Sequence, residues 1–109
     1  MEKPLISKTR KAGNLLFLSG MTGGEGNTET QIRNIFEKIK EILEDASASM
    51  DDVVSATVYL TDINDRSKHF NNIWREYFSE NPPTRTCVEV GLAPPITAEM
   101  TVIASIPSD

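Results

Sequence analysis

Arg85, Cys87 and Glu89 are the residues whose types and spacing could support chemistry. They lie in a short run after Pro82 and Pro83. Because side chains of a strand alternate between its faces, the cation, the thiol and the carboxylate should share one face. Burying such groups without partners is costly, so we expect water, another subunit or a ligand to meet that face. The spacing alone equally permits a structural ion pair of Arg85 with Glu89 or Glu99.

The sequence gives little support to a metal site or to a catalytic cysteine thiolate. Cys87 is the only cysteine and His69 the only histidine. An isolated cysteine often behaves as a small buried hydrophobic group, and no second cysteine or neighbouring histidine is present to activate it. We therefore expect Cys87 to line a pocket rather than to act as a nucleophile, and His69 to lie on the surface. The sequence predicts no metal site and no cofactor.

The elements that must position these residues follow from periodicity. Residues 14–20, 53–61 and 97–106 are predicted to be strands, in addition to the run that holds Arg85. Thr28 and Gln31 match a capping box, which predicts a helix to about residue 46. A second helix is predicted to begin near Asp65 and to end near Phe78. The apolar stripes of the two helices comprise Ile32, Ile35, Phe36, Ile39, Ile42 and Leu43, and Phe70, Ile73, Trp74, Tyr77 and Phe78.

The strands each show one apolar and one semi-polar face. The apolar faces are predicted to hold Val54, Ala56, Val58 and Leu60, and Ala98, Met100, Val102, Ala104 and Ile106. The helices can cover these faces, which gives one α+β domain of two layers over residues 1–109. The other face is predicted to carry Tyr59, Cys87, Ile103 and several hydroxyl groups. A wet interface between subunits suits that mixture.

The charge and composition of the chain argue against some classes of function. The net charge is −5 and the pI near 4.8, which disfavours general binding of nucleic acid. No run of about 18 apolar residues predicts a membrane span, and the first residues show no apolar signal core. With one cysteine, the chain is expected to be cytoplasmic, with neither a nucleic acid nor a membrane as a partner.

Four segments together carry a family resemblance. They are Gly-Asn-Leu-Leu-Phe-Leu-Ser-Gly at 13–20, the run at 43–62, Asn-Asn-Ile-Trp-Arg-Glu-Tyr-Phe at 71–78 and, most specific, Pro-Thr-Arg-Thr-Cys-Val-Glu-Val at 83–90. The sequence resembles the RidA/YjgF family of reactive intermediate deaminases, some members of which are named endoribonuclease L-PSP or translation inhibitor. The resemblance implies a chorismate-mutase-like fold and a homotrimer, whose sheets form an inner barrel with clefts between subunits.

The resemblance also implies an activity and a site. The reaction is hydrolysis of enamines and imines, such as 2-aminoacrylate or 2-aminocrotonate, to a 2-keto acid and ammonia. Arg85 matches the position that grips the substrate carboxylate, and Glu99 the one that positions water or relays a proton. Cys87, Ser19, Gly20 and Asn71 match positions that line the cleft.

One departure from the family pattern bears on activity. Ile6 stands where the family has a tyrosine in the site, so one hydrogen-bonding group is missing. This change favours an alternative function, a non-catalytic trimeric regulatory protein that binds small carboxylates such as keto acids. The family's older names suggest a third function, ribonuclease activity, against which the acidic charge and the single histidine argue.

Overall fold

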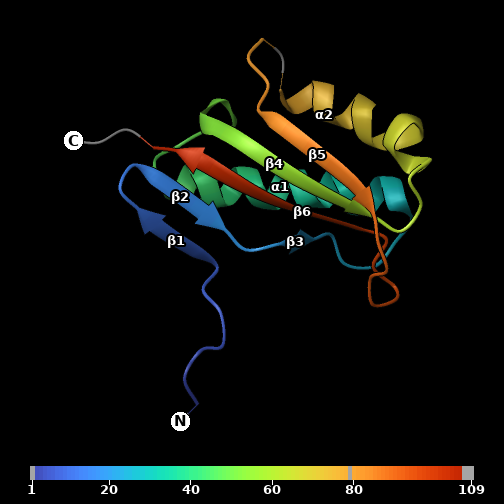
Figure 1. Cartoon of the computed structure of the whole chain (residues 1–109), viewed down its shortest axis with the longest axis horizontal. Coiled ribbons are helices and arrows are strands. Elements are labelled where there is room, and N and C mark those ends of the chain that lie inside the picture. Colours follow the sequence, from blue (N-terminus) through green and yellow to red (C-terminus); the bar gives the residue numbers. More distant parts are fainter. Residues whose placement is uncertain (1, 79, 107–109) are drawn as a thin grey trace.

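The computed structural model describes residues 2–78 and 80–106. Its elements in chain order are β1 (Thr9–Ala12), β2 (Leu15–Leu18), β3 (Met21–Thr22), α1 (Thr28–Asp45), a 3₁₀ turn (Met50–Asp52), β4 (Val53–Leu60), a π-helix (Arg66–Phe70), α2 (Asn71–Tyr77), β5 (Thr84–Glu89) and β6 (Ala98–Ser105) (Figure 1).

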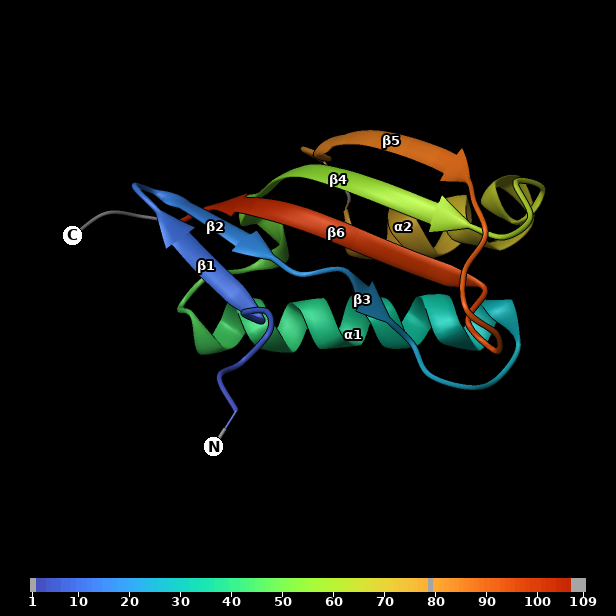
Figure 2. The ribbon, with the colours of Figure 1, turned by 60° about the horizontal axis from the view of Figure 1, so that its bottom comes forward.

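The strands form one six-stranded sheet in the order β1-β2-β6-β4-β5, with the short β3 also paired to β6. β4 and β5 run parallel, and the other pairs are antiparallel. Figure 2 shows both helices on one face of this sheet, α1 beneath its middle and α2 beneath β4 and β5. The predicted two-layer α+β fold is therefore confirmed.

The core lies between the sheet and the helices, as the periodicity predicts. All six apolar residues of the predicted α1 stripe are buried, and so are Ala56, Val58, Leu60, Ala98, Met100, Val102 and Ala104 from the sheet. No helix of the described residues is long and apolar enough to cross a membrane.

The start of α1 differs from the predicted capping box. The cap is Asn27, whose Oδ1 accepts a hydrogen bond from the backbone N–H of Thr30 at 2.8 Å. Gln31 is instead fully buried, where its amide donates to the carbonyls of Gly26 and Pro95 and accepts from the N–H of Thr97. The predicted capping role for Gln31 is thus wrong, because the side chain ties the helix to the loop before β6.

Two strand predictions also need correction. A register shift between Val53 and Ser55 places Val53 in the core and leaves Val54 44% exposed. The predicted apolar face of β4 is therefore wrong at this one residue. β2 is only half buried in the single chain, because Leu15 and Phe17 are each 39% exposed on the face away from the helices.

A π-helix precedes α2, where the sequence predicts one continuous helix. The N–H of Asn71 donates to the carbonyl of Arg66, which is a hydrogen bond across five residues rather than four. Such a turn contains one extra residue and often lies at a functional site. Four of the five predicted stripe residues are buried here, and Tyr77 is half-buried.

An aromatic cluster joins α2 to α1. Phe36 of α1 stacks on Tyr77 with ring centroids 4.6 Å apart, and it lies 5.7 Å from Phe70, 6.3 Å from Trp74 and 5.9 Å from Phe78. The Tyr77 hydroxyl donates to Glu37, and burial followed by this hydrogen bond raises the pKa of Tyr77 to about 12.

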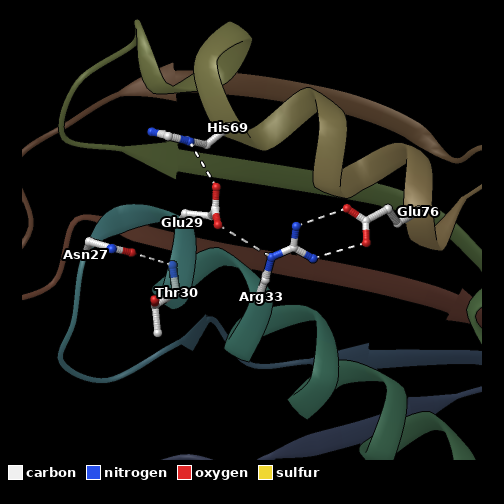
Figure 3. Close-up of polar contacts among 6 residues, drawn as sticks. All are labelled: Asn27, Glu29, Thr30, Arg33, His69 and Glu76. Atoms are coloured by element: carbon white, nitrogen blue, oxygen red, sulfur yellow. Dashed lines mark hydrogen bonds and ion pairs between the residues drawn. The ribbon is translucent and has the colours of Figure 1, made fainter.

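Polar contacts along the exposed edge also join the two helices (Figure 3). The Arg33 guanidinium donates to both Glu76 oxygens, at 3.1 Å each, and lies 3.9 Å from Glu29. His69 Nδ1 lies 3.6 Å from the other oxygen of Glu29. Because these side chains are about half exposed, such ion pairs contribute little to the free energy of folding. The aromatic cluster is therefore the main attachment of α2.

Candidate functional site

A hollow of about 440 Å³ opens between α2 and β5 and is called the Arg85 hollow below. Its lining residues are Asn71, Trp74, Arg75, Phe78, Pro82 and Arg85. The α2 residues recur at intervals of three and four, so they lie on one side of that helix. The structure thus brings together Asn71 and Arg85, two of the residues that the sequence predicts for the site.

Arg85 is held by aromatic faces and not by an acid. Its guanidinium carbon lies 5.0 Å from the centroid of Trp74 and 5.7 Å from that of Phe70. Such contacts orient a cation. Within residues 2–78 and 80–106, no carboxylate lies within 4.0 Å of Arg85, although Glu89 is on the same face. The alternative of a structural ion pair with Glu89 or Glu99 is therefore not found.

Glu89 instead supports the backbone. One of its oxygens accepts a hydrogen bond from the N–H of Ile63 at 3.0 Å. The donors of Arg85 are consequently available for an anion, and a planar guanidinium fork matches a carboxylate with two parallel hydrogen bonds.

Asn71 supplies an unusual group at the hollow. Its side-chain oxygen is buried and has no hydrogen-bond partner among the described residues. A buried acceptor without a donor costs about 1–3 kcal/mol, so such atoms commonly have a water or ligand as partner. Because the oxygen has almost no accessible surface in this conformation, a rotation of the Asn71 side chain towards the hollow is needed before it can accept a hydrogen bond from a ligand N–H or O–H group.

Cys87 faces the helices, because it lies in register with Val58 and packs against the core. The prediction that Cys87 shares a face with Tyr59 and Ile103 is wrong. Cys87 is two residues after Arg85 in β5, so both side chains lie on the face that meets the helices. Burial raises the pKa of the thiol, and the nearby Arg85 and Arg66 only partly oppose that shift. The thiol is therefore protonated at neutral pH and unsuited to attack as a thiolate.

Glu99 lies on the opposite face of the sheet. It is in register with Tyr59 and Thr22, one residue out of step with the buried Ala98 and Met100. Gly20 leaves the space that the Glu99 carboxylate occupies, since a Cβ atom at position 20 would collide with Glu99 Oε2. Ser19 is adjacent, with its hydroxyl donating to the carbonyl of Ser7 at 2.7 Å. We call Ser19, Gly20 and Glu99 the Glu99 cluster.

The predicted site thus divides into two halves. The sheet separates the Arg85 hollow from the Glu99 cluster within one chain, and Cys87 lies on the side of the hollow. The alternation of side chains within one strand could not reveal this separation. It shows which residues of a strand share a face, but not which face of one strand lies next to which face of another.

Sequence reasoning missed part of the hollow. Trp74 and Phe78 were assigned to a buried stripe only, and Arg75 and Pro82 were not singled out. The spacing of Asn71, Arg75 and Phe78 is the signal that could have found them, because it places polar residues next to the aromatic stripe. The described residues contain no group of three or more side chains suited to hold a metal ion.

The fold and the hollow together define a class: a two-layer α+β protein with an unpaired guanidinium next to an open pocket. The family model described as Endoribonuclease L-PSP matches residues 5–106. A RutC family protein of Pyrococcus abyssi is 42% identical over 113 residues, covering 94% of this chain and 88% of that protein. The 3-aminoacrylate deaminase RutC of Acinetobacter baylyi is 36% identical and covers 84% and 78%.

Among solved structures, RidA from an Antarctic Psychrobacter superimposes with a TM-score of 0.87 at 31% identity, covering 97% of this chain and 92% of that one. The chain belongs to the RidA/YjgF family, as the segments around Arg85 and Asn71 predict.

Proposed function

We propose that this protein hydrolyses reactive 2-enamine and 2-imine acids, such as 2-aminoacrylate or 2-aminocrotonate, to 2-keto acids and ammonia. The observation that carries the proposal is that one hollow is lined by Arg85, whose guanidinium has no acidic partner among the described residues, and by Asn71, whose buried oxygen has no hydrogen-bond partner among them. The relative named 3-aminoacrylate deaminase supports the same reaction class.

The two groups suit the two ends of such a substrate. Arg85 binds the carboxylate with two parallel hydrogen bonds. Asn71 Oδ1 then accepts a hydrogen bond from the protonated imine nitrogen. Water adds to the C=N carbon, the C–N bond breaks, and ammonia leaves as the keto oxygen forms. Holding the reactants in this geometry can supply several kcal/mol of the barrier reduction.

The reaction also needs a group that positions water or moves a proton. Glu99 has the right chemistry but lies across the sheet from Arg85 in one chain. We infer that a neighbouring subunit supplies it, in a homotrimer whose sheets face inward. The exposed Leu15 and Phe17, with the half-buried Ile103 paired to Phe17, support this assembly because no described residue covers them fully.

Assembly gives the first prediction. The protein is expected to have a solution mass of about three times the 12.1 kDa chain mass by light scattering. Phe17→Asp should shift the mass towards that of one chain, because it places a charge among these apolar side chains. Lys40→Glu, an exposed change on α1, is the matched control and should keep the trimer. A wild-type mass of one chain would contradict the trimer.

The activity is tested by coupling the protein to a threonine or serine dehydratase and following 2-keto acid release. Semicarbazide is present to trap imine that escapes. The proposal expects faster keto-acid release and less semicarbazone. Unchanged kinetics at micromolar protein, with fold and assembly verified, would refute it.

Glu99→Gln gives the second prediction. The amide keeps the size of the side chain but cannot accept a proton, so kcat should fall by about a hundredfold or more. The affinity for a keto-acid product should stay within about threefold, because Arg85 is intact. Glu41→Gln on the exposed side of α1 is the control. Equal loss of rate and affinity would contradict a role in proton transfer.

A second candidate is a small-carboxylate sensor without turnover. Ile6 favours it, since this side chain is 73% exposed and brings no hydroxyl group to any site. A sensor would bind keto acids through Arg85 and give no rate enhancement in the coupled assay.

A further inference from the structure

Arg75 adds a second guanidinium to the Arg85 hollow. It projects from α2, and its only polar contact in the described residues is a hydrogen bond to Asn72 Oδ1 at 3.3 Å. Arg33 on α1 is different, because two carboxylates neighbour it. No acidic side chain is among the described residues that line the hollow. Two cations therefore border one pocket without a carboxylate partner in the described part of the chain.

The positive charge is local to this hollow. The chain as a whole carries −5, so the basic residues here are not part of a generally basic surface. Arg66 also lies close enough to act on the Cys87 thiol together with Arg85, which adds a third guanidinium nearby. A single carboxylate on Arg85 would leave Arg75 without a counter-charge, whereas a ligand with two acidic groups would satisfy both cations.

Apolar side chains form part of the lining of the hollow. Trp74, Phe78 and Pro82 line the same hollow, and Phe78 is buried while Pro82 is exposed. These surfaces suit a short carbon chain with a charged group at each end, because the methylenes contact apolar atoms while the charges meet the guanidinium groups.

We propose that the Arg85 hollow selects 2-imino dicarboxylates, with Arg85 on the carboxylate next to the imine and Arg75 on the distal one. This inference rests on the proposed deaminase function and names its substrate class. The reaction balances as before: water supplies the oxygen of the new C=O bond, the C–N bond breaks, and ammonia leaves. The distal carboxylate is unchanged, and no oxidant takes part.

Binding is tested first, independently of turnover. Trp74 is the only tryptophan and lies against Arg85, so its emission reports occupancy of the hollow. The probes are 2-oxoglutarate and 2-oxopentanoate, which have equal chain length and differ by the second carboxylate. We expect 2-oxoglutarate to bind about tenfold more tightly, since a charge-assisted hydrogen bond is added.

Arg75→Gln should bring the ratio of the two affinities towards one, mainly through weaker binding of 2-oxoglutarate. Lys40→Gln removes a cation from the exposed side of α1 and should keep the ratio. Equal affinities in the wild type, or a preference that survives Arg75→Gln, would overturn the inference. A loss of assembly in Arg75→Gln would also overturn it, since Arg75 would then serve a neighbouring subunit.

The rates at which two imines are hydrolysed test this inference separately from the proposed deaminase function. 2-Iminoglutarate is generated by glutamate oxidase with catalase, and 2-iminopentanoate by an amino acid oxidase acting on norvaline. Faster hydrolysis of the dicarboxylate, lost in Arg75→Gln, supports both proposals. Equal hydrolysis of both imines refutes only the dicarboxylate selection. Selective binding of 2-oxoglutarate with no hydrolysis of either imine refutes the deaminase and retains the selectivity.

Discussion

Arg85→Ala is expected to lower kcat/KM for keto-acid release by about a hundredfold or more, and to remove keto-acid binding. Losing one partner of a desolvated, hydrogen-bonded charge pair commonly costs about 2–5 kcal/mol. Arg75 also lines the hollow, but among the described residues only Arg85 lies over the rings of Trp74 and Phe70, so Arg75 does not hold a carboxylate at the same place. The coupled dehydratase assay measures the rate, and calorimetry with 2-oxobutyrate measures the affinity.

Arg85→Lys is the informative companion. It keeps the charge but loses the planar fork, so we expect intermediate binding and a rate well below that of the wild type. Near-ultraviolet circular dichroism should show an intact aromatic cluster in both variants. Full activity of Arg85→Ala would remove the basis of the proposed function, because no carboxylate anchor would then be required.

Phe36→Ala is expected to reduce the free energy of unfolding by about 3–5 kcal/mol. Phe36 is fully buried and contacts four aromatic rings of α2 and its flanks. Truncation leaves a cavity where α1 meets α2, and typical domains have only about 5–15 kcal/mol of stability. Urea denaturation followed by circular dichroism measures the change.

The control is Leu5→Ala, which truncates a side chain that is 97% exposed and should change stability by less than about 0.5 kcal/mol. All samples need the same protein concentration, because assembly would make the unfolding midpoint concentration-dependent. A loss below about 1 kcal/mol for Phe36→Ala would mean that α2 is attached mainly by the exposed polar contacts of Arg33.

The sequence allowed the layers of the fold to be predicted, because burial follows periodicity. The α1 stripe and the alternate residues of β6 repeat at fixed intervals, so their buried faces could be assigned one element at a time. Val54 could not be assigned in this way, since a single shift in register changes the face of a residue. The burial of Gln31 was hidden for a similar reason, because two of its three side-chain hydrogen bonds go to segments more than 60 residues away.

The candidate site was predictable only in its residue types. Arg85 and Asn71 could be chosen from the family resemblance, and the structure brings them to one hollow. That Glu99 lies across the sheet from Arg85 depends on how β4 pairs with both β5 and β6. Such long-range pairing leaves no local trace in the sequence, so the two halves of the site could not be separated beforehand.

The wide helical turn at Arg66–Phe70 affects how this protein can vary in length. The turn holds one residue more than an α-helix needs, directly before Asn71. Removing a residue from that turn would let it relax to α-helical geometry, while the buried Ile73 and Trp74 keep α2 in place. The connection between β4 and α2 can therefore lose a residue during evolution without a change in the orientation of the helix face that lines the hollow.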